Sequence, residues 1–209
     1  MSKVYRQISK KRAIKMDSTD KENFTKPNTV ALVSAFREDA LGKDDAVGIA
    51  EKIRCGDLDA RSVTLAAIER AKSVNPELNA IAVENFDAAV PASKKGFEGV
   101  FQGVPTFIKD TDEVKGLPLY MGSQCLPGEL STKSSITAKK VLATGLNCLG
   151  TTTTPEFGFT GTTESMRFGA TRNPWNPTYS TGGSSGGSAV SVASHECLAS
   201  LGSDTGGSI

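Results

Sequence analysis

The sequence contains one histidine, four cysteines and no long apolar run. No stretch approaches the roughly 20 apolar residues that a membrane-spanning helix needs. The cysteines lie far apart and form no C-x-x-C pair, which argues against a compact zinc site and against a disulfide framework. We therefore expect them to be small buried side chains in a reducing compartment. They are Cys55, Cys125, Cys148 and Cys197.

An excess of charge of either sign is also missing. The chain has 24 Lys and Arg against 23 Asp and Glu, a net charge of +1. Charge therefore gives no sign of a nucleic-acid or membrane partner. The basic N-terminus lacks the apolar segment of a secretory signal, so we expect a cytoplasmic protein, although these residues also fit an organellar presequence. We interpret residues 1–42 as a polar tail and approach segment, and residues 43–209 as the domain.

The first half of the domain shows helical spacing of apolar residues. We expect Asp44 to cap the first helix and Gly56 to end it, and Pro76 to lie just beyond the second helix. Pro91 interrupts a weaker third helical pattern. The predicted elements, in order, are a helix over 44–56, a helix over 60–73, a strand over 80–83 and a helix over 86–94.

After Gly103, short apolar strands alternate with helices. Ser134 or Ser135 is expected to cap the first of these helices, and Gly145 to end it. This alternation predicts an α/β fold with a mixed, mostly parallel sheet that helices cover on both faces. The expected elements are a strand over 104–109, a helix over 135–143, a strand over 146–150, a helix over 187–194 and a strand over 197–201.

The last 30 residues, 180–209, contain 7 Gly and 9 Ser. A flexible linker has this composition, but the apolar residues at 189–190 and 197–199 require burial, which a linker does not provide. Clustered glycine instead indicates backbone that approaches a partner closely or takes a positive φ. A phosphate-binding loop needs a lysine after its glycines, and none follows them here.

Two ways of activating a serine remain for this segment. A G-x-S-x-G elbow fits Ser184 and Ser185, but it needs a histidine beyond the acid, far downstream of the serine. His195 is too close and precedes Asp204, so we expect it to be a partly exposed residue at a helix end.

The second way uses a neutral lysine as the base. Lys109 ends an apolar strand, where a parallel sheet places its binding crevice, and burial there would lower its pKa. An ordinary surface lysine beside Asp110 remains the alternative.

Several ordered motifs resemble those of the amidase signature family. The resemblance covers about residues 44–209 and implies that Lys109 is the family's lysine, Ser184 its serine on a cis peptide, and Ser208 its nucleophile. Thr151 and Thr181 depart from the family pattern, where lysine and proline are common. The motifs are GVP and IKD (103–110), TPEF (154–157), TRNPWNP (171–177), GGSSGGSA (182–189) and GSDTGGSI (202–209).

The resemblance implies an amide hydrolase that works without metal or organic cofactor on a small-molecule amide. Ser208 would attack the carbonyl, and its proton would pass through Ser184 to Lys109. The oxyanion hole would consist of the backbone amides of Thr205, Gly206 and Gly207. A homo-oligomer is compatible with this function.

Two alternatives stay open. The chain could belong to the glutaminase component of an amidotransferase, its A subunit, which acts with partner subunits in tRNA-linked Asn and Gln synthesis. It could also be an inactive truncated fragment, since the family domain extends well past Ile209.

Overall fold

The structure is a computed structural model that describes residues 32–209. The helices are α1 (Ala46–Cys55), α2 (Ala60–Leu78), α3 (Phe86–Ser93), α4 (Ile136–Leu142) and α5 (Gly186–Ala193), with a 3-10 turn η2 (Glu156–Gly158). The main strands are β1 (Ile81–Glu84), β2 (Pro105–Lys109), β3 (Asn147–Thr152) and β8 (Ala199–Leu201). Two hairpins pair β4 (Glu164–Ser165) with β5 (Gly169–Ala170) and β6 (Arg172–Asn173) with β7 (Asn176–Ser180).

None of the helices within residues 32–209 has the length and apolar character needed to cross a membrane.

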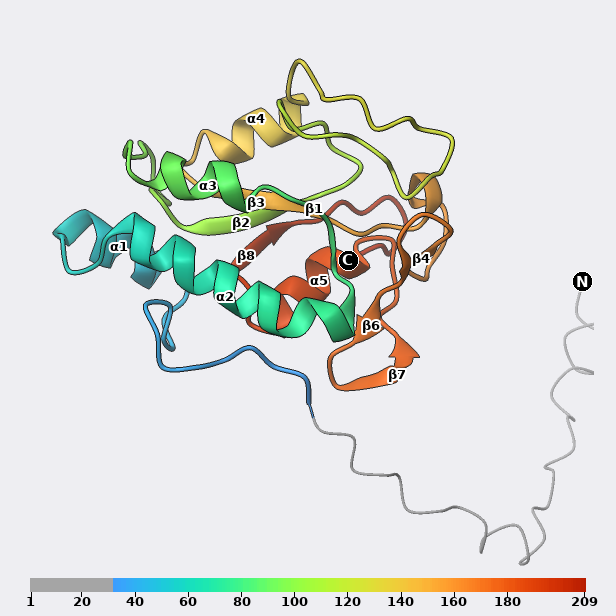
Figure 1. The fold of residues 1–209 in the computed structure, drawn as a ribbon, viewed down its shortest axis with the longest axis horizontal. Helices are drawn as coiled ribbons and strands as arrows, with labels where there is room; N and C mark the ends of the chain where they lie inside the picture. Colours follow the sequence, from blue (N-terminus) through green and yellow to red (C-terminus); the bar gives the residue numbers. More distant parts are fainter. Residues whose placement is uncertain (1–31) are drawn as a thin grey trace, which may run out of the picture. The chain divides into compact units, whose positions relative to one another are not determined.

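The four main strands form one sheet in the order β1-β3-β2-β8. β2 runs parallel to both β3 and β8, whereas β1 is antiparallel to β3. Helix α4 lies on one face of this sheet, and α2 and α5 lie on the other (Figure 1). The predicted α/β class with a mixed, mostly parallel sheet is therefore confirmed. The carboxyl ends of β2, β3 and β8 meet at one edge, which is where parallel sheets place their sites.

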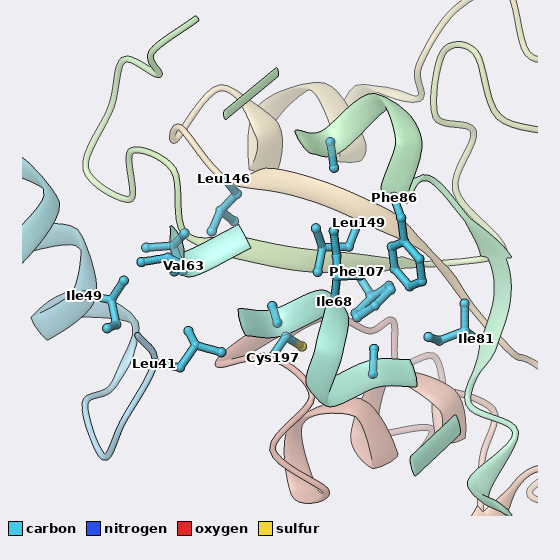
Figure 2. Close-up of a cluster of buried hydrophobic side chains, with 14 of the residues drawn as sticks. Leu41, Ile49, Val63, Ile68, Ile81, Phe86, Phe107, Leu146, Leu149 and Cys197 are labelled. Atoms are coloured by element: carbon cyan, nitrogen blue, oxygen red, sulfur yellow. The ribbon is translucent and has the colours of Figure 1, made fainter. Parts of the chain in front are cut away.

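Strand β2 is buried on both faces, and its side chains alternate between two apolar clusters. Phe107 packs with Ile68 of α2, Phe86 of α3 and Leu149 of β3 (Figure 2). Ile108 instead packs in the cluster that contains Ala138 of α4. By the same alternation, residue 109 faces the side of α2 and α5, and residue 110 faces the opposite side.

The first two helices differ from the prediction at two of their four ends. Asp45, not Asp44, caps α1, because its carboxylate accepts the amide of Gly48 at 2.8 Å. Gly56 ends α1 as expected, with φ of 83°. Helix α2 continues to Leu78, so Pro76 lies inside its last turn. There the missing N–H removes a single hydrogen bond, and packing of Leu78 in the core holds the turn in place.

The second half follows the predicted order closely. Ser135 caps α4 through the amide of Ala138, and α5, β2, β3 and β8 lie within two residues of the predicted bounds. Both hairpins and η2 were not predicted. Cys148 and Cys197 are buried as expected, but Cys55 and Cys125 are exposed because they end α1 and lie in a surface loop.

The described part of the approach segment, residues 32–42, packs against the domain. The amide of Ala35 donates to the carbonyl of Ser194, and Asp39 forms a 2.6 Å ion pair with the fully buried Arg70 of α2. A buried guanidinium needs such partners, since leaving it unpaired is costly. The rest of the predicted tail, residues 1–31, lies outside the described residues.

Glu196, between α5 and β8, is a fully buried carboxyl group. Burial raises the pKa of Glu196 to about 7, and the hydroxyl of Ser194 offsets only part of this shift. Its Oε2 has no hydrogen-bond partner within residues 32–209. The folded state therefore binds this proton more tightly than the unfolded chain does, and it loses stability as pH rises from about 4.5 to 7.

We predict that Glu196→Gln becomes more stable relative to wild type as pH rises, because the amide never has to ionise. The free energies of unfolding should diverge by on the order of 3 kcal/mol between pH 4.5 and pH 8. Denaturant titrations at both pH values measure this, and any pH-independent cost of the substitution cancels in the comparison. A difference that is equal at the two pH values would contradict the prediction.

Candidate active site

The polar residues of the site gather where the ends of β2 and β8 meet the N-terminus of α5. Lys109, the last residue of β2, is 1% exposed. The strand carries it there because Phe107, two residues earlier, points to the same face and is anchored in the core. The side chain of Lys109 therefore reaches its partners without contacting bulk water.

Lys109, Ser184 and Ser208, which the sequence selected, come together in the structure. Lys109 Nζ lies 2.7 Å from Ser184 Oγ, and Ser184 Oγ lies 3.1 Å from Ser208 Oγ. The peptide bond between Gly183 and Ser184 is cis. The two serines and the lysine thus form one continuous hydrogen-bonded chain, with Ser184 in the middle.

Two further serines hold the same lysine, and the sequence did not single them out as its partners. Lys109 Nζ donates to Ser185 Oγ and to Ser203 Oγ, both at 3.0 Å. Ser185 Oγ also donates to the carbonyl of Ser203 at 2.7 Å and accepts its amide at 3.0 Å. Nine serines among 30 residues offered no local signal that would separate these two from the rest.

The surroundings of Lys109 disfavour its charged form. Burial lowers the pKa of Lys109 below its ordinary value, while Asp112 and Asp204 oppose this and raise it. Ser185 is the N-cap residue of α5, so the positive end of the helix dipole lies beside the amine. Hydroxyl partners and a helix N-terminus together favour a neutral amine more than a carboxylate partner would.

Glycine is required where α5 approaches the sheet. A Cβ at Gly186 would lie 2.1 Å from Thr163 Oγ1, and a Cβ at Gly187 would lie 2.5 Å from the amide of Thr153. The first turn of α5 therefore touches the segment that follows β3. This contact places Ser184 and Ser185 within reach of Lys109.

A cavity of about 400 Å³ opens beside Ser208. The predicted oxyanion residues Thr205, Gly206 and Gly207 form part of its wall. The amide of Gly207 donates to Asp204 Oδ1 at 2.5 Å, and amides of residues 206–209 lower the pKa of Asp204. The turn therefore directs its N–H groups toward negative charge, which Asp204 supplies here.

The opposite wall consists of residues 157–161. Phe157 has φ of 52°, and Gly158 lies so close to Ser184 that an added Cβ would contact its Oγ at 3.4 Å. The sequence marked this region only through the TPEF motif, without a role for its residues. The structure makes it the neighbour of the serine chain.

His195 lies outside this cluster. It is exposed after the C-terminus of α5, where Nδ1 lies 3.0 Å from Ser34 Oγ and the ring packs edge-on against Phe36. These contacts join His195 to the approach segment. Its place after the end of α5 is the one expected from the sequence.

With this geometry in place, comparison with known proteins identifies the family. The family model described as Amidase matches residues 62–209. The chain belongs to the amidase family. It is 45% identical over 182 residues to "Putative amidase AmiC" of Mycobacterium tuberculosis, a match that covers 86% of this chain and 38% of that protein. It is also 38% identical over 172 residues to the A subunit of glutamyl-tRNA(Gln) amidotransferase from Lachnospira eligens, covering 78% and 36%.

Solved structures of the amidase family share the fold. The structure of 6-aminohexanoate cyclic dimer hydrolase aligns with a TM-score of 0.70 at 36% identity, over 77% of this chain and 33% of that one. A structure described as an amidase aligns with a TM-score of 0.72 at 31% identity, over 79% and 40%. This chain thus spans about 38% of the length of the first curated relatives it matches.

We predict that His195→Ala leaves amide hydrolysis within about twofold of wild type, because the ring contacts Ser34 and Phe36 and not the lysine cluster. Steady-state kinetics in the full-length protein, with circular dichroism as a check of folding, would measure this. A loss beyond about a hundredfold in a folded variant, the scale of a missing general base, would overturn the lysine-based site.

Proposed function

We propose that the protein containing this chain is an amide hydrolase that forms an acyl-enzyme on Ser208. One observation carries the proposal: Ser208 joins a hydrogen-bonded chain that leads through Ser184 to a lysine that is 1% exposed. A serine hydroxyl is a weak nucleophile until a base takes its proton, and this chain connects it to one.

The direction of the hydrogen bonds depends on the charge of Lys109. As an ammonium it donates to Ser184, which donates in turn to Ser208. When the amine is neutral, both hydroxyls rotate, so that Ser208 donates to Ser184 and Ser184 donates to Nζ. Attack by Ser208 Oγ then moves its proton to Ser184 while the proton of Ser184 moves to Lys109. The return of this proton to the leaving amine releases the product and leaves the ester on Ser208.

Ser185 and Ser203 orient the amine of Lys109 as this proton route requires. The single hydroxyl proton of Ser185 goes to the carbonyl of Ser203, so toward Lys109 it can only accept. A neutral amine has two N–H donors and one lone pair. With the donors on Ser185 Oγ and Ser203 Oγ, the lone pair faces Ser184.

The oxyanion that forms on attack needs donors beside Ser208. The amides of Thr205, Gly206 and Gly207 are proposed for this role, because all three residues line the cavity beside Ser208. The amides of Gly206 and Gly207 already stabilise the carboxylate of Asp204. The amide of Gly207 has to exchange Asp204 for the oxyanion during the reaction. One such donor contributes on the order of 3 kcal/mol of transition-state stabilisation.

The proposed substrate is a small amide, and no metal or organic cofactor takes part in these steps. A glutaminase that serves as the A subunit of an amidotransferase is the second candidate, because the chain is 38% identical to such a protein over 172 residues. The 45% identity to AmiC over 182 residues favours the first. Release of ammonia from glutamine, measured against hydrolysis of simple amides, distinguishes the two.

We predict that Ser208→Ala abolishes amide hydrolysis in the full-length protein, because Ser208 is the hydroxyl at which the hydrogen-bonded route from Lys109 reaches the cavity. After treatment with a serine-reactive phosphonate, mass spectrometry should locate the adduct on the peptide that contains Ser208. An adduct on Ser184 or Ser185 would show that the nucleophile has been misassigned.

We predict that Lys109→Ala and Lys109→Met abolish turnover, because each removes the base. Met has a similar length and should keep the fold, and Lys109→Arg should not restore activity, since a guanidinium stays charged. Because only the neutral amine accepts the proton, kcat/KM of the wild type should fall as pH drops below the lowered pKa of Lys109. Wild-type turnover with an unchanged acidic limb in Lys109→Ala would disprove this role.

A further inference from the structure

The residue that follows Lys109 is a second buried ionisable group, with no part in the proton route above. Asp110 is 0% exposed, and its amide continues the pairing with β3 by donating to the carbonyl of Thr152 at 3.1 Å. Because strand side chains alternate, its carboxyl group faces away from the serines that surround Lys109. It must therefore interact with something else at the end of the sheet.

Its partner is the turn at residues 120–122. The amide of Tyr120 donates to Asp110 Oδ1 at 3.3 Å, and the amides of Met121 and Gly122 also favour the anion. Burial raises the pKa of Asp110 to about 7, against these amides and the charge of Arg167. Oδ2 has no hydrogen-bond partner within the described residues. Burying a carboxyl group with one unpaired oxygen costs stability. Unlike Glu196, Asp110 is also held by the amides of a turn that packs on the cavity wall.

The turn connects the carboxylate to the wall of the cavity. A Cβ on Gly122 would lie 2.5 Å from the carbonyl of Thr154, so the turn packs directly on that backbone. The carbonyl of Met121 accepts the amide of Phe157 at 2.8 Å. On the far side of this segment, Thr154 Oγ1 donates to the carbonyl of Ser184 at 3.0 Å.

We propose that Asp110 is a positioning residue for amide hydrolysis: its carboxylate fixes the turn at 120–122, and the turn fixes residues 154–158 against Ser184 and Ser208. This inference rests on the proposed function, since it assigns a task within the same site. Asp110 touches neither substrate nor the reacting atoms. Its effect passes through the backbone contacts of Met121 and Gly122.

Asp110→Asn tests the proposal with little change of shape. The side-chain oxygen can still accept the amide of Tyr120. The substitution removes the negative charge that the amides of Met121 and Gly122 favour, so the turn is held less firmly. A displaced wall should raise KM more than it lowers kcat, for a loss of about ten- to a hundredfold in kcat/KM. Titration of Ser208 with a fluorophosphonate gives the fraction of competent sites, which should stay near that of wild type.

Glu196→Gln is the matched control, because Glu196 is equally buried but lies outside the cavity wall. Both neutral variants should gain stability relative to wild type as pH rises, whereas only Asp110→Asn should lose kcat/KM. Gly122→Ala disturbs the same wall through the turn itself, and it serves as the second test if Asp110→Asn does not fold. The added methyl group forces the turn away from Thr154, so this variant should also raise KM. In the double variant with Asp110→Asn, the loss in kcat/KM, expressed as a free energy, should be smaller than the sum of the two single losses.

The outcomes separate the two proposals. If Ser208→Ala retains wild-type activity, the proposed function fails. If Ser208→Ala is inactive while Asp110→Asn or Gly122→Ala stays within twofold of wild type, only the positioning role fails. A fall in kcat that matches a reduced fraction of competent sites, with KM unchanged, would show that Asp110 serves folding alone.

Discussion

The removal of Lys109 from water is the constraint on which the site depends. A buried amine needs hydrogen-bond partners, and here they are the hydroxyls of Ser184, Ser185 and Ser203 rather than a carboxylate. Burial lowers the pKa of Lys109, and hydroxyls satisfy the amine without holding its charge as a carboxylate partner would. Bringing three hydroxyls to one strand end requires α5 and the segment after β8 to approach closely. The glycines at 186 and 187 allow α5 to come this close, because a Cβ at either position would collide with Thr163 or Thr153.

The resemblance to the amidase signature family selected Lys109, Ser184 and Ser208, which lie together in the structure. Lys109 ends an apolar run, and Ser184 and Ser208 lie in glycine-rich motifs of fixed spacing. Ser185 and Ser203 lie in the same two motifs, but nothing local marks them as partners of Lys109, since that contact depends on how two distant segments fold over the strand. Sequence pattern thus predicts which residue types assemble, and tertiary packing decides which of several equivalent hydroxyls takes part.

The errors in secondary structure have a similar origin. Two adjacent aspartates could cap α1, and the choice of Asp45 depends on one hydrogen bond to Gly48. The hairpins of β4 to β7 have strands of two to five residues, too short for a periodic signal. Long-range contacts define the loops around them: Asn79 Nδ2 donates to the carbonyl of Phe168 at 2.7 Å, and Thr171 Oγ1 donates to the carbonyl of Asn79 at 2.8 Å. No local pattern contains that information.

Lys109 and Asp110 can be neighbours in the sequence only because the extended backbone directs their side chains to opposite faces of the sheet. If the carboxylate lay on the same face as the amine, it would hold Lys109 as an ammonium and remove the base. No ion pair joins them within residues 32–209, because the pleat directs the two side chains to opposite faces. A slip of one residue in β2 would exchange these faces. The register of β2 therefore determines the chemistry of the site, and Phe107 and Ile108, packed in separate clusters, fix that register.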